Sequence, residues 1–326
     1  MNIHLGNILR VIAGFFTLAV ILILLKPLRL NRLVSKPKPV NDYVTAVKRI
    51  AVLQQLDTPE VNPLCRLHWL SHGHRMDRVV IFWHGYTSCP RQFHQLGQIF
   101  HAQGYNVLIP RLPHHGLTDR LASDQTRLTA EDLAALVDEV TDLAHGLGQQ
   151  VTVAGFSAGG VLAGWTAQHR SDVERVVIIS PVFWLKAIPA ALSQPFIKLL
   201  LALPNFYRWW DPILKAESPG PQHGYPRYSS RALAQILRLG LAVRLAARSA
   251  KPAARSITVV TNPNDWAVDN IVAAEVAAQW RHNGSGNLQT YEFAASHELP
   301  HEIIDPEHDA AQVALVYPIL AELIAG

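Results

Sequence analysis

Short apolar runs rich in β-branched residues recur along the chain after about residue 65. Six of them have the length of buried strands: Val79–Trp83, Asn106–Pro110, Gln150–Ala154, Val173–Ser180, Ser256–Thr261 and Leu288–Phe293. In most of them the apolar residues follow one another rather than alternate with polar ones, which is typical of strands buried on both faces of a sheet.

Three longer stretches have the apolar spacing of amphipathic helices: Thr129–Gly146, Ala267–His282 and Ala310–Ile324. The first opens with T-A-E-D, a helix-capping pattern. Strands that alternate with helices predict an α/β fold, with a mostly parallel central sheet flanked by helices. The interval 181–255 is too long for one crossover helix and contains further apolar helical patterns. We therefore expect an inserted helical cap there, over the carboxyl edge of the sheet.

An uncharged apolar run, Val11–Leu25, lies near the N-terminus. With Ile8 and Leu9 across Arg10 it reaches about 18 residues, the short end of what spans a bilayer. No small-residue cleavage site follows, which disfavours a signal peptide. We predict an N-terminal transmembrane helix as membrane anchor over residues 1–26. A signal peptide and a buried core helix are the alternatives.

Basic residues follow the apolar run and predict the orientation of the anchor. Lys26, Arg29, Arg32, Lys36 and Lys38 lie after it, whereas only Arg10 and the α-amine precede it. The positive-inside rule then predicts a single-pass membrane protein with its main domain on the cytoplasmic side. We expect a basic linker and lead-in over residues 27–64 and one α/β domain over residues 65–326.

The composition excludes several classes of protein. The 326 residues are 49% hydrophobic and only 17% charged, so the chain is not disordered. The net charge is +4, but no basic run interleaved with aromatic residues occurs, so we expect no nucleic-acid partner. Cys65 and Cys89 are too few for a disulfide framework or a Cys-rich zinc site. One bridge and two buried thiols both remain open.

The clearest chemical signal is V-T-V-A-G-F-S-A-G-G at residues 151–160. A strand leads into G-x-S-x-G at Gly155–Gly159, and a helix follows. A tight turn of this kind lifts the serine hydroxyl clear of the sheet, and the helix N-terminus stabilises negative charge beside it. Ser157 is therefore the candidate nucleophile. The alternative is an ordinary turn between a strand and a helix.

A second signal is I-F-W-H-G-Y-T-S at residues 81–88, a buried strand that ends in His-Gly. A serine nucleophile needs an oxyanion hole, and one donor comes from the backbone just after this strand. We expect the backbone N–H groups of Tyr86 and Ala158 to form it. His84 is expected to brace the loop rather than to transfer protons.

These motifs resemble the α/β-hydrolase superfamily, in particular its carboxylesterase and monoacylglycerol-lipase-like branch. His84–Ser88 is similar to the family's H-G-F-T-G-type oxyanion loop, and the elbow at Ser157 matches fully. Pro110–Gly116 resembles its P-x-x-G-H-G loop, except that His114 replaces the first glycine. The resemblance covers residues 65–324 and implies the α/β-hydrolase fold with an order of serine, acid and histidine along the chain.

Two aspartates and two histidines compete for the remaining positions of a catalytic triad. Asp265 and Asp269 both follow the strand S-I-T-V-V-T, and the family pattern of Asp, two residues, then Val or Ile favours Asp265. His297 and His301 both follow the last strand. The family's H-x-x-x-x-D-like stretch is similar to His301–Pro306 and favours His301 as the base.

A zinc site is the competing interpretation, because residues 297–301 spell H-E-L-P-H. That motif binds zinc when both histidines lie on one helical face, and Pro300 disfavours such a helix. We therefore predict no metal and no cofactor. A non-catalytic binding protein of the same fold is a third possibility, although it would be expected to lack a triad member.

The predicted function is that of a serine hydrolase of carboxylic esters that acts through an acyl-enzyme. An apolar cap and a membrane anchor favour a small lipophilic acyl ester, such as a monoacylglycerol, as the substrate. Acyl transfer and thioester hydrolysis on the same triad are the enzymatic alternatives.

Overall fold

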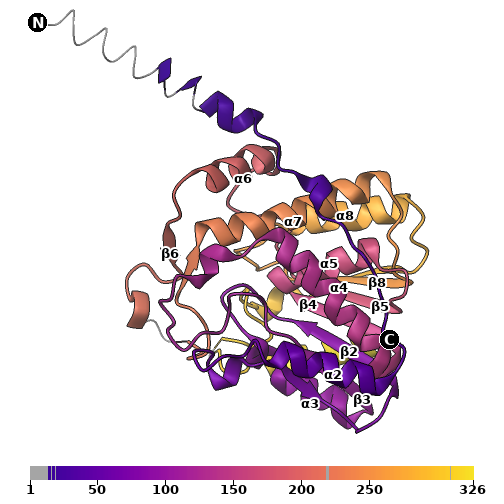
Figure 1. Ribbon diagram of the computed structural model, residues 1–326. Helices are drawn as coiled ribbons and strands as arrows, with labels where there is room; N and C mark the ends of the chain where they lie inside the picture. The colour runs from indigo at the N-terminus through magenta and orange to yellow at the C-terminus, as the bar shows by residue number, and fades with distance from the viewer. Residues whose placement is uncertain (1–13, 16, 19, 218–219, 309) are drawn as a thin grey trace, which may run out of the picture.

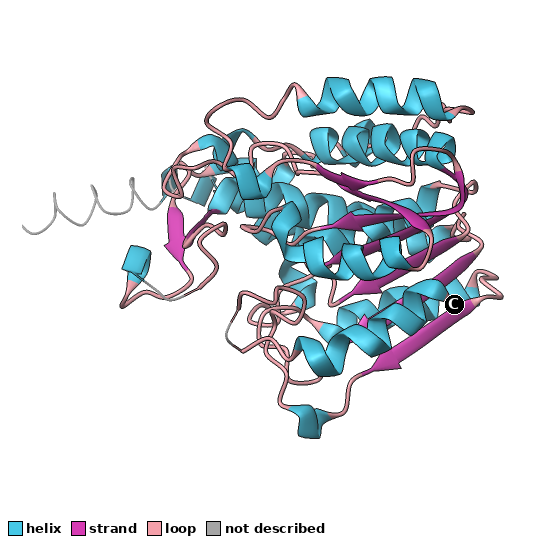
Figure 2. Ribbon diagram, turned by 90° about the horizontal axis from the view of Figure 1, so that it is seen from below, coloured by secondary structure: helices cyan, strands magenta, loops and turns pink. Residues whose placement is uncertain are grey.

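The computed structural model describes residues 14, 15, 17, 18, 20–217, 220–308 and 310–326. A seven-stranded sheet with the order β1-β3-β2-β4-β5-β8-β9 forms its centre (Figure 2). Only β1 is antiparallel to its neighbour. The strands are β1 (His68–Leu70), β2 (Met76–Trp83), β3 (Tyr105–Ile109), β4 (Gly148–Phe156), β5 (Arg175–Ile179), β8 (Ser256–Thr261) and β9 (Leu288–Glu292).

Both faces of this sheet are buried in apolar cores. In β2, Val79 and Ile81 belong to one core, whereas Val80 and Phe82 belong to the other. Side chains alternate between the faces of a strand, so a strand between two cores needs apolar residues at every position. The unbroken apolar runs in the sequence have this cause, and the predicted mostly parallel sheet is confirmed.

Helices cover the two faces unequally (Figures 1 and 2). One core contains residues of four long helices: α4 (Ala130–Leu147), α5 (Ala158–His169), α7 (Ser230–Ser249) and α8 (Asn270–His282). The other contains residues of α3 (His94–Ala102) and α9 (Val313–Ala325). An additional helix, α2 (Tyr43–Gln54), packs against α4. Short 3₁₀ helices occur at Leu30–Arg32 (η1), Pro63–Cys65 (η2), Pro90–Phe93 (η3), Asp124–Arg127 (η4), Ala190–Leu192 (η5), Lys215–Glu217 (η6) and Ala295–His297 (η7).

The segment of residues 181–255 lies between β5 and β8, and we call it the insertion. It contains α6 (Ser193–Ala202), the antiparallel pair β6 (Tyr207–Trp209) and β7 (Arg227–Ser229), and α7. Helix α7 packs against both α5 and α8. One end of the insertion therefore joins the helical layer on the sheet.

The prediction of a single-pass membrane protein is corrected by the structure. Residues 1–13, 16 and 19 of the predicted anchor lie outside the described residues. In the part that is described, no helix has the length and apolarity to cross a membrane. The predicted membrane partnership and cytoplasmic side rested on that span and are withdrawn with it.

Cys65 and Cys89 form a disulfide bond. Cys65 ends η2, and Cys89 precedes η3, so the bridge joins the lead-in segment to the loop that follows β2. Both residues are fully buried. Of the two alternatives that the sequence left open, the structure shows the bridge.

A buried arginine at the end of α5 interacts with two acidic residues of α4 and with a third in the loop after α5. The guanidinium of Arg170 is inaccessible to solvent and donates to Asp142 at 2.7 Å and to Asp172 at 2.7 and 2.9 Å. It also lies 3.3 Å from Asp138. Burial raises the pKa of Asp172, but hydrogen bonds from Arg170 and His145 outweigh that effect and hold the pKa well below its usual range.

Arg170→Ala is expected to lower the free energy of unfolding by about 3–5 kcal/mol, because it leaves buried carboxylates without their cation. Urea denaturation at neutral pH measures this loss. The matched control is Arg255→Ala, which breaks the exposed pair with Glu174 and should cost less than about 1 kcal/mol.

The free energy of unfolding of Arg170→Ala should also depend on pH differently from that of the wild type. Because the folded pKa of Asp172 is lowered, its contribution is present above the ordinary carboxyl pKa and is lost as the pH falls toward the folded value. The difference between the wild type and Arg170→Ala should therefore shrink in acid. A difference that does not change with pH would contradict this account.

Candidate active site

Ser157 lies at the sharp turn between β4 and α5. Its backbone has φ 56° and ψ −109°, a conformation that side chains with a Cβ rarely adopt. The turn is tight: a Cβ at Gly155 would lie 2.1 Å from the Gly159 carbonyl oxygen. A Cβ at Gly159 would lie 2.0 Å from the carbonyl oxygen of Trp83, the last residue of β2. The glycines of G-x-S-x-G are therefore required by backbone contacts.

The structure brings Ser157 together with His301 and Asp265. The Ser157 hydroxyl lies 3.0 Å from Nε2 of His301, and Nδ1 of His301 lies 2.6 Å from Oδ2 of Asp265. A carboxylate only accepts hydrogen bonds, so Nδ1 carries the proton and Nε2 is free to accept from the serine. The three side chains form one continuous chain of hydrogen bonds.

Asp265 is fixed in its orientation by the loop after β8. Its side chain is inaccessible to solvent, and Oδ1 accepts hydrogen bonds from the backbone N–H groups of Ala267 at 2.8 Å and Val268 at 3.2 Å. The other oxygen, Oδ2, is left for His301. The carboxylate is therefore held before any substrate binds.

The competing aspartate and histidine lie in different surroundings. Asp269 is the N-cap of α8 and accepts from the N–H groups of Ile271 and Val272. His297 ends η7, and within the described residues its side chain forms no hydrogen bond with Ser157 or Asp265. Glu298 follows with a left-handed backbone at φ 49°, so H-E-L-P-H is not helical and the geometry of the zinc motif is missing.

The two predicted oxyanion donors come from adjacent strands. Tyr86 follows β2, and Ala158 is the first residue of α5, which follows β4. Trp83 and Gly155 are paired in the register of these two strands. In the part of the chain that the structure describes, neither the Tyr86 nor the Ala158 N–H donates to a backbone acceptor outside its element. Both donors remain available for a ligand.

His84 braces the loop, as its sequence position suggested. Nδ1 lies 2.9 Å from the Gly85 carbonyl oxygen, and Nε2 accepts from the N–H of Leu112 at 3.1 Å. Full burial, with His115 beside it, holds the pKa of His84 well below its usual value. Burial likewise lowers the pKa of His115 to about 4. Neutral imidazoles thus tie the loops after β2 and β3 together.

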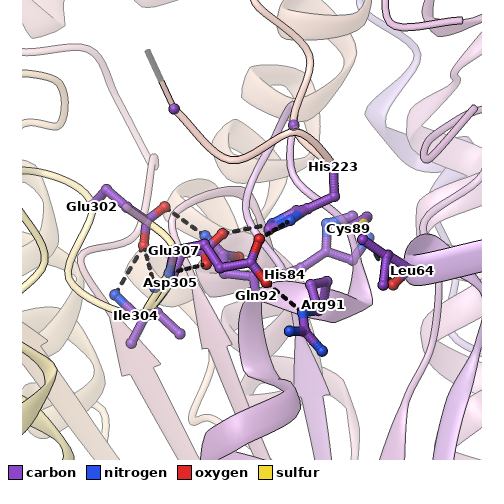
Figure 3. A network of polar contacts seen from close by, with 12 residues as sticks. Leu64, His84, Cys89, Arg91, Gln92, His223, Glu302, Ile304, Asp305 and Glu307 are labelled. Atoms are coloured by element: carbon purple, nitrogen blue, oxygen red, sulfur yellow. Dashed lines mark hydrogen bonds and ion pairs between the residues drawn. The ribbon is translucent and has the colours of Figure 1, made fainter. Parts of the chain in front are cut away.

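A buried glutamine connects the oxyanion loop to the loop of His301 (Figure 3). Gln92 accepts from the Gly85 N–H at 2.7 Å and donates to Glu302, the neighbour of His301, at 2.6 Å. Burial and the nearby Asp305 raise the pKa of Glu302. The link fixes the relative position of the two loops.

Residues of the insertion form polar contacts with the loops after β2 and β9. His223 lies 2.7 Å from Asp305 and 3.3 Å from Glu307, both in the loop after β9 (Figure 3). Thr87, next to Tyr86, accepts from the N–H of Tyr225 at 2.7 Å and from the indole of Trp210 at 2.9 Å. The insertion therefore contacts the loops on both sides of Ser157.

A model of the alpha/beta hydrolase family matches residues 80–314, which is most of the chain. The chain belongs to this family. The resemblance to the α/β-hydrolase superfamily seen in the sequence is thereby confirmed. The sheet, the helices and the serine elbow described above are those of an α/β-hydrolase.

This α/β-hydrolase is similar to monoacylglycerol lipases, which confirms the resemblance to the carboxylesterase and monoacylglycerol-lipase-like branch. It is 32% identical over 114 residues to a thermostable monoacylglycerol lipase of Bacillus sp. (strain H-257), a match that covers 35% of this chain and 44% of that relative. A monoacylglycerol lipase of Paleococcus ferrophilus superposes with a TM-score of 0.59 at 17% identity, over 80% of this chain and 99% of the other. A soluble variant of monoglyceride lipase from Saccharomyces cerevisiae superposes with a TM-score of 0.58 at 13% identity, over 79% and 90%.

Several residues of this α/β-hydrolase site have no signal in the sequence. Gln92, Glu302 and His223 are distant along the chain, and no motif links them. Burial is the feature that points to the role of one of them: Gln92 is inaccessible to solvent, and a buried polar side chain needs hydrogen-bond partners.

Gln92→Met keeps the volume but removes both hydrogen bonds and should lower the free energy of unfolding by about 1–3 kcal/mol. The rate at which Ser157 is labelled by a fluorophosphonate should also fall, because the Gly85 N–H next to the oxyanion loop loses its acceptor. Urea denaturation and initial rates measure the two effects. Gln95→Met is the control, because Gln95 is exposed one turn away, and neither quantity should change. Equal effects from both variants would contradict the role given to Gln92.

Proposed function

We propose that this α/β-hydrolase is a serine hydrolase of carboxylic esters. Ser157 is the nucleophile, His301 is the base, and Asp265 is the carboxylate that orients His301. The observation that supports this most strongly is the hydrogen-bond chain of 3.0 and 2.6 Å through the imidazole of His301. It has the geometry that a weakly nucleophilic hydroxyl needs for activation.

The proposed reaction runs through an acyl-enzyme. The Ser157 oxygen attacks the ester carbonyl while Nε2 of His301 takes the hydroxyl proton, and Asp265 stabilises the imidazolium that forms. The N–H groups of Tyr86 and Ala158 donate to the oxyanion. His301 returns the proton to the leaving alcohol as the carbon–oxygen bond breaks. A water then attacks the acyl-enzyme by the same route, which releases the acid and restores Ser157.

A lipophilic acyl ester is the substrate class that the surroundings favour. The ring of Trp266 lies 6.5 Å from that of His301 and is 62% exposed, and Trp210 of the insertion lies 6.4 Å from Trp266. Exposed indoles beside the site offer an apolar surface to an acyl chain or its alcohol. In this proposal the insertion acts as a cap. A relative that is a monoacylglycerol lipase supports the same class.

Ser157→Ala should abolish covalent labelling by a fluorophosphonate and the hydrolysis of p-nitrophenyl esters of graded chain length. The reason is that, among the residues the structure describes, Ser157 carries the hydroxyl that is paired with His301. Circular dichroism checks that the variant is folded. If the wild type hydrolyses none of the esters but transfers the acyl group to an added alcohol, acyltransfer replaces hydrolysis. Hydrolysis of acyl thioesters alone would make the protein a thioesterase.

Asp265→Asn and His301→Ala should each lower kcat by several orders of magnitude, because the base loses its orientation or is absent. Asp269→Asn and His297→Ala are the matched controls and should leave kcat within a few-fold of the wild type. Steady-state kinetics on one soluble ester decides. If the two pairs exchanged their effects, the assignment of acid and base would be overturned. A loss of activity on chelation that zinc restores would instead support the H-E-L-P-H site.

A further inference from the structure

A cavity of about 330 Å³ lies between the N-terminal segment and two helices of the insertion. Its walls come from residues 23–32, α6 and α7, with Glu131 of α4 at the base. Figure 1 shows these segments converging at the end of the molecule where the N-terminal helix joins it. The cavity contains none of the residues of the candidate active site. Its size is within the range of small-molecule sites, which begins at about 300 Å³.

The charge of this cavity is strongly unbalanced. Glu131 is its single acidic lining residue, whereas six lining residues are cations: Lys26, Arg29, Arg32, Lys198, Arg231 and Arg238. Glu131 is already engaged, because both of its oxygens accept from Arg238 at 2.7 and 2.8 Å. Hydrogen bonds from Arg238 lower the pKa of Glu131 and keep it ionised. No further carboxylate offsets the other five cations in the wall.

Arg238 also builds the wall in which those cations lie. Its side chain is buried, and beyond Glu131 it donates to the carbonyl oxygens of Leu28 at 2.7 Å and Arg29 at 3.0 Å. These bonds hold the turn in which Arg29 adopts a left-handed backbone at φ 52°. Lys198 of α6 donates to the Leu24 carbonyl oxygen, which closes the other side. The arrangement is therefore fixed from the helices and does not depend on a ligand.

The remaining cations repel one another unless an anion joins them. Arg29, Arg32 and Arg231 form no ion pair with a carboxylate among the residues that the structure describes. Guanidinium groups present donors in a planar fork that matches phosphate oxygens, and several cations suit a dianion better than a monovalent carboxylate. Apolar residues stand beside them, namely Ile23, Leu28 and Leu201. An ester group on the phosphate would contact these.

We propose that this cavity is a binding site for the phosphate group of a phosphate ester, separate from the site of ester hydrolysis. The phosphate bridges Arg29 and Arg32 of the N-terminal segment to Arg231 of α7. It thereby holds that segment against the insertion. Either a free phosphate ester or a phospholipid headgroup supplies this chemistry, and the two sources are distinguished by experiment.

The first experiment titrates the full chain with inorganic phosphate by calorimetry and follows Tm in parallel. Phosphate should bind and raise Tm, whereas sodium chloride at equal ionic strength should not. Arg231→Ala and Arg29→Ala should each weaken binding about tenfold or more, since each removes a charged donor pair. Arg248→Ala, which removes the same charge from an exposed position of α7, should leave binding unchanged.

The second experiment covers the lipid source. The full chain is sedimented with phosphatidylcholine vesicles with and without phosphatidic acid. Sedimentation that requires phosphatidic acid, and that Arg231→Ala but not Arg248→Ala abolishes, identifies a headgroup site even if inorganic phosphate gives no heat. The proposal is overturned if neither probe binds, or if Arg248→Ala weakens binding as much as Arg231→Ala does. Neither readout depends on esterase activity.

Discussion

The approach of the turn at Ser157 to the end of β2 is the constraint on which the site depends. Gly159 lies so close to the Trp83 carbonyl that no side chain fits between them, and this contact brings the start of α5 beside the loop that carries Tyr86. The positive-φ conformation of Ser157 costs about 1–3 kcal/mol. The burial of α5, whose residues are inaccessible along almost its whole length, offsets that cost many times over. The buried helix that follows therefore holds the strained serine in place.

Around this turn, the polar groups of the loops are paired with one another rather than with solvent. Parallel strands bring their carboxyl ends to one edge, so residues far apart in the chain meet there. His84 connects the loops after β2 and β3, and Gln92 connects the loop after β2 to that of His301. A buried polar group without a partner is costly, so each such bond restricts the loops to one arrangement. The proposed triad and oxyanion donors are thus oriented by residues that take no part in the proposed chemistry.

The sequence predicted those features of the structure that depend on neighbouring residues in the chain, and missed those that depend on contacts between distant residues. The strands β2, β3, β4, β5 and β8 were evident because burial on two faces demands unbroken apolar runs, whereas β9, predicted with them, is largely exposed. The edge strand β1 was missed because it is three residues long and half-buried, and α3 was missed because its nine residues include a glycine. The motif around Ser157 is local and was recognised, whereas the preference for Asp265 over Asp269 came from the family resemblance. Gln92 and Glu302 are far apart in the chain and contact each other only in the folded structure, so no sequence pattern predicts their hydrogen bond.

The N-terminal segment shows the opposite error, in which composition was given too much weight. Apolar residues were counted across Arg10, and the cations after them were interpreted only as an orientation signal. In the structure three of those cations, Lys26, Arg29 and Arg32, line the cavity beside the insertion. A buried arginine, Arg238, fixes the backbone at Leu28 and Arg29. The same insertion donates to Thr87, beside the proposed oxyanion donor Tyr86. Arg231, which lines the cavity, is two residues from Ser229, whose backbone forms hydrogen bonds with the Tyr86 hydroxyl. A short stretch of the insertion therefore connects the cationic cavity to the loop that carries Tyr86.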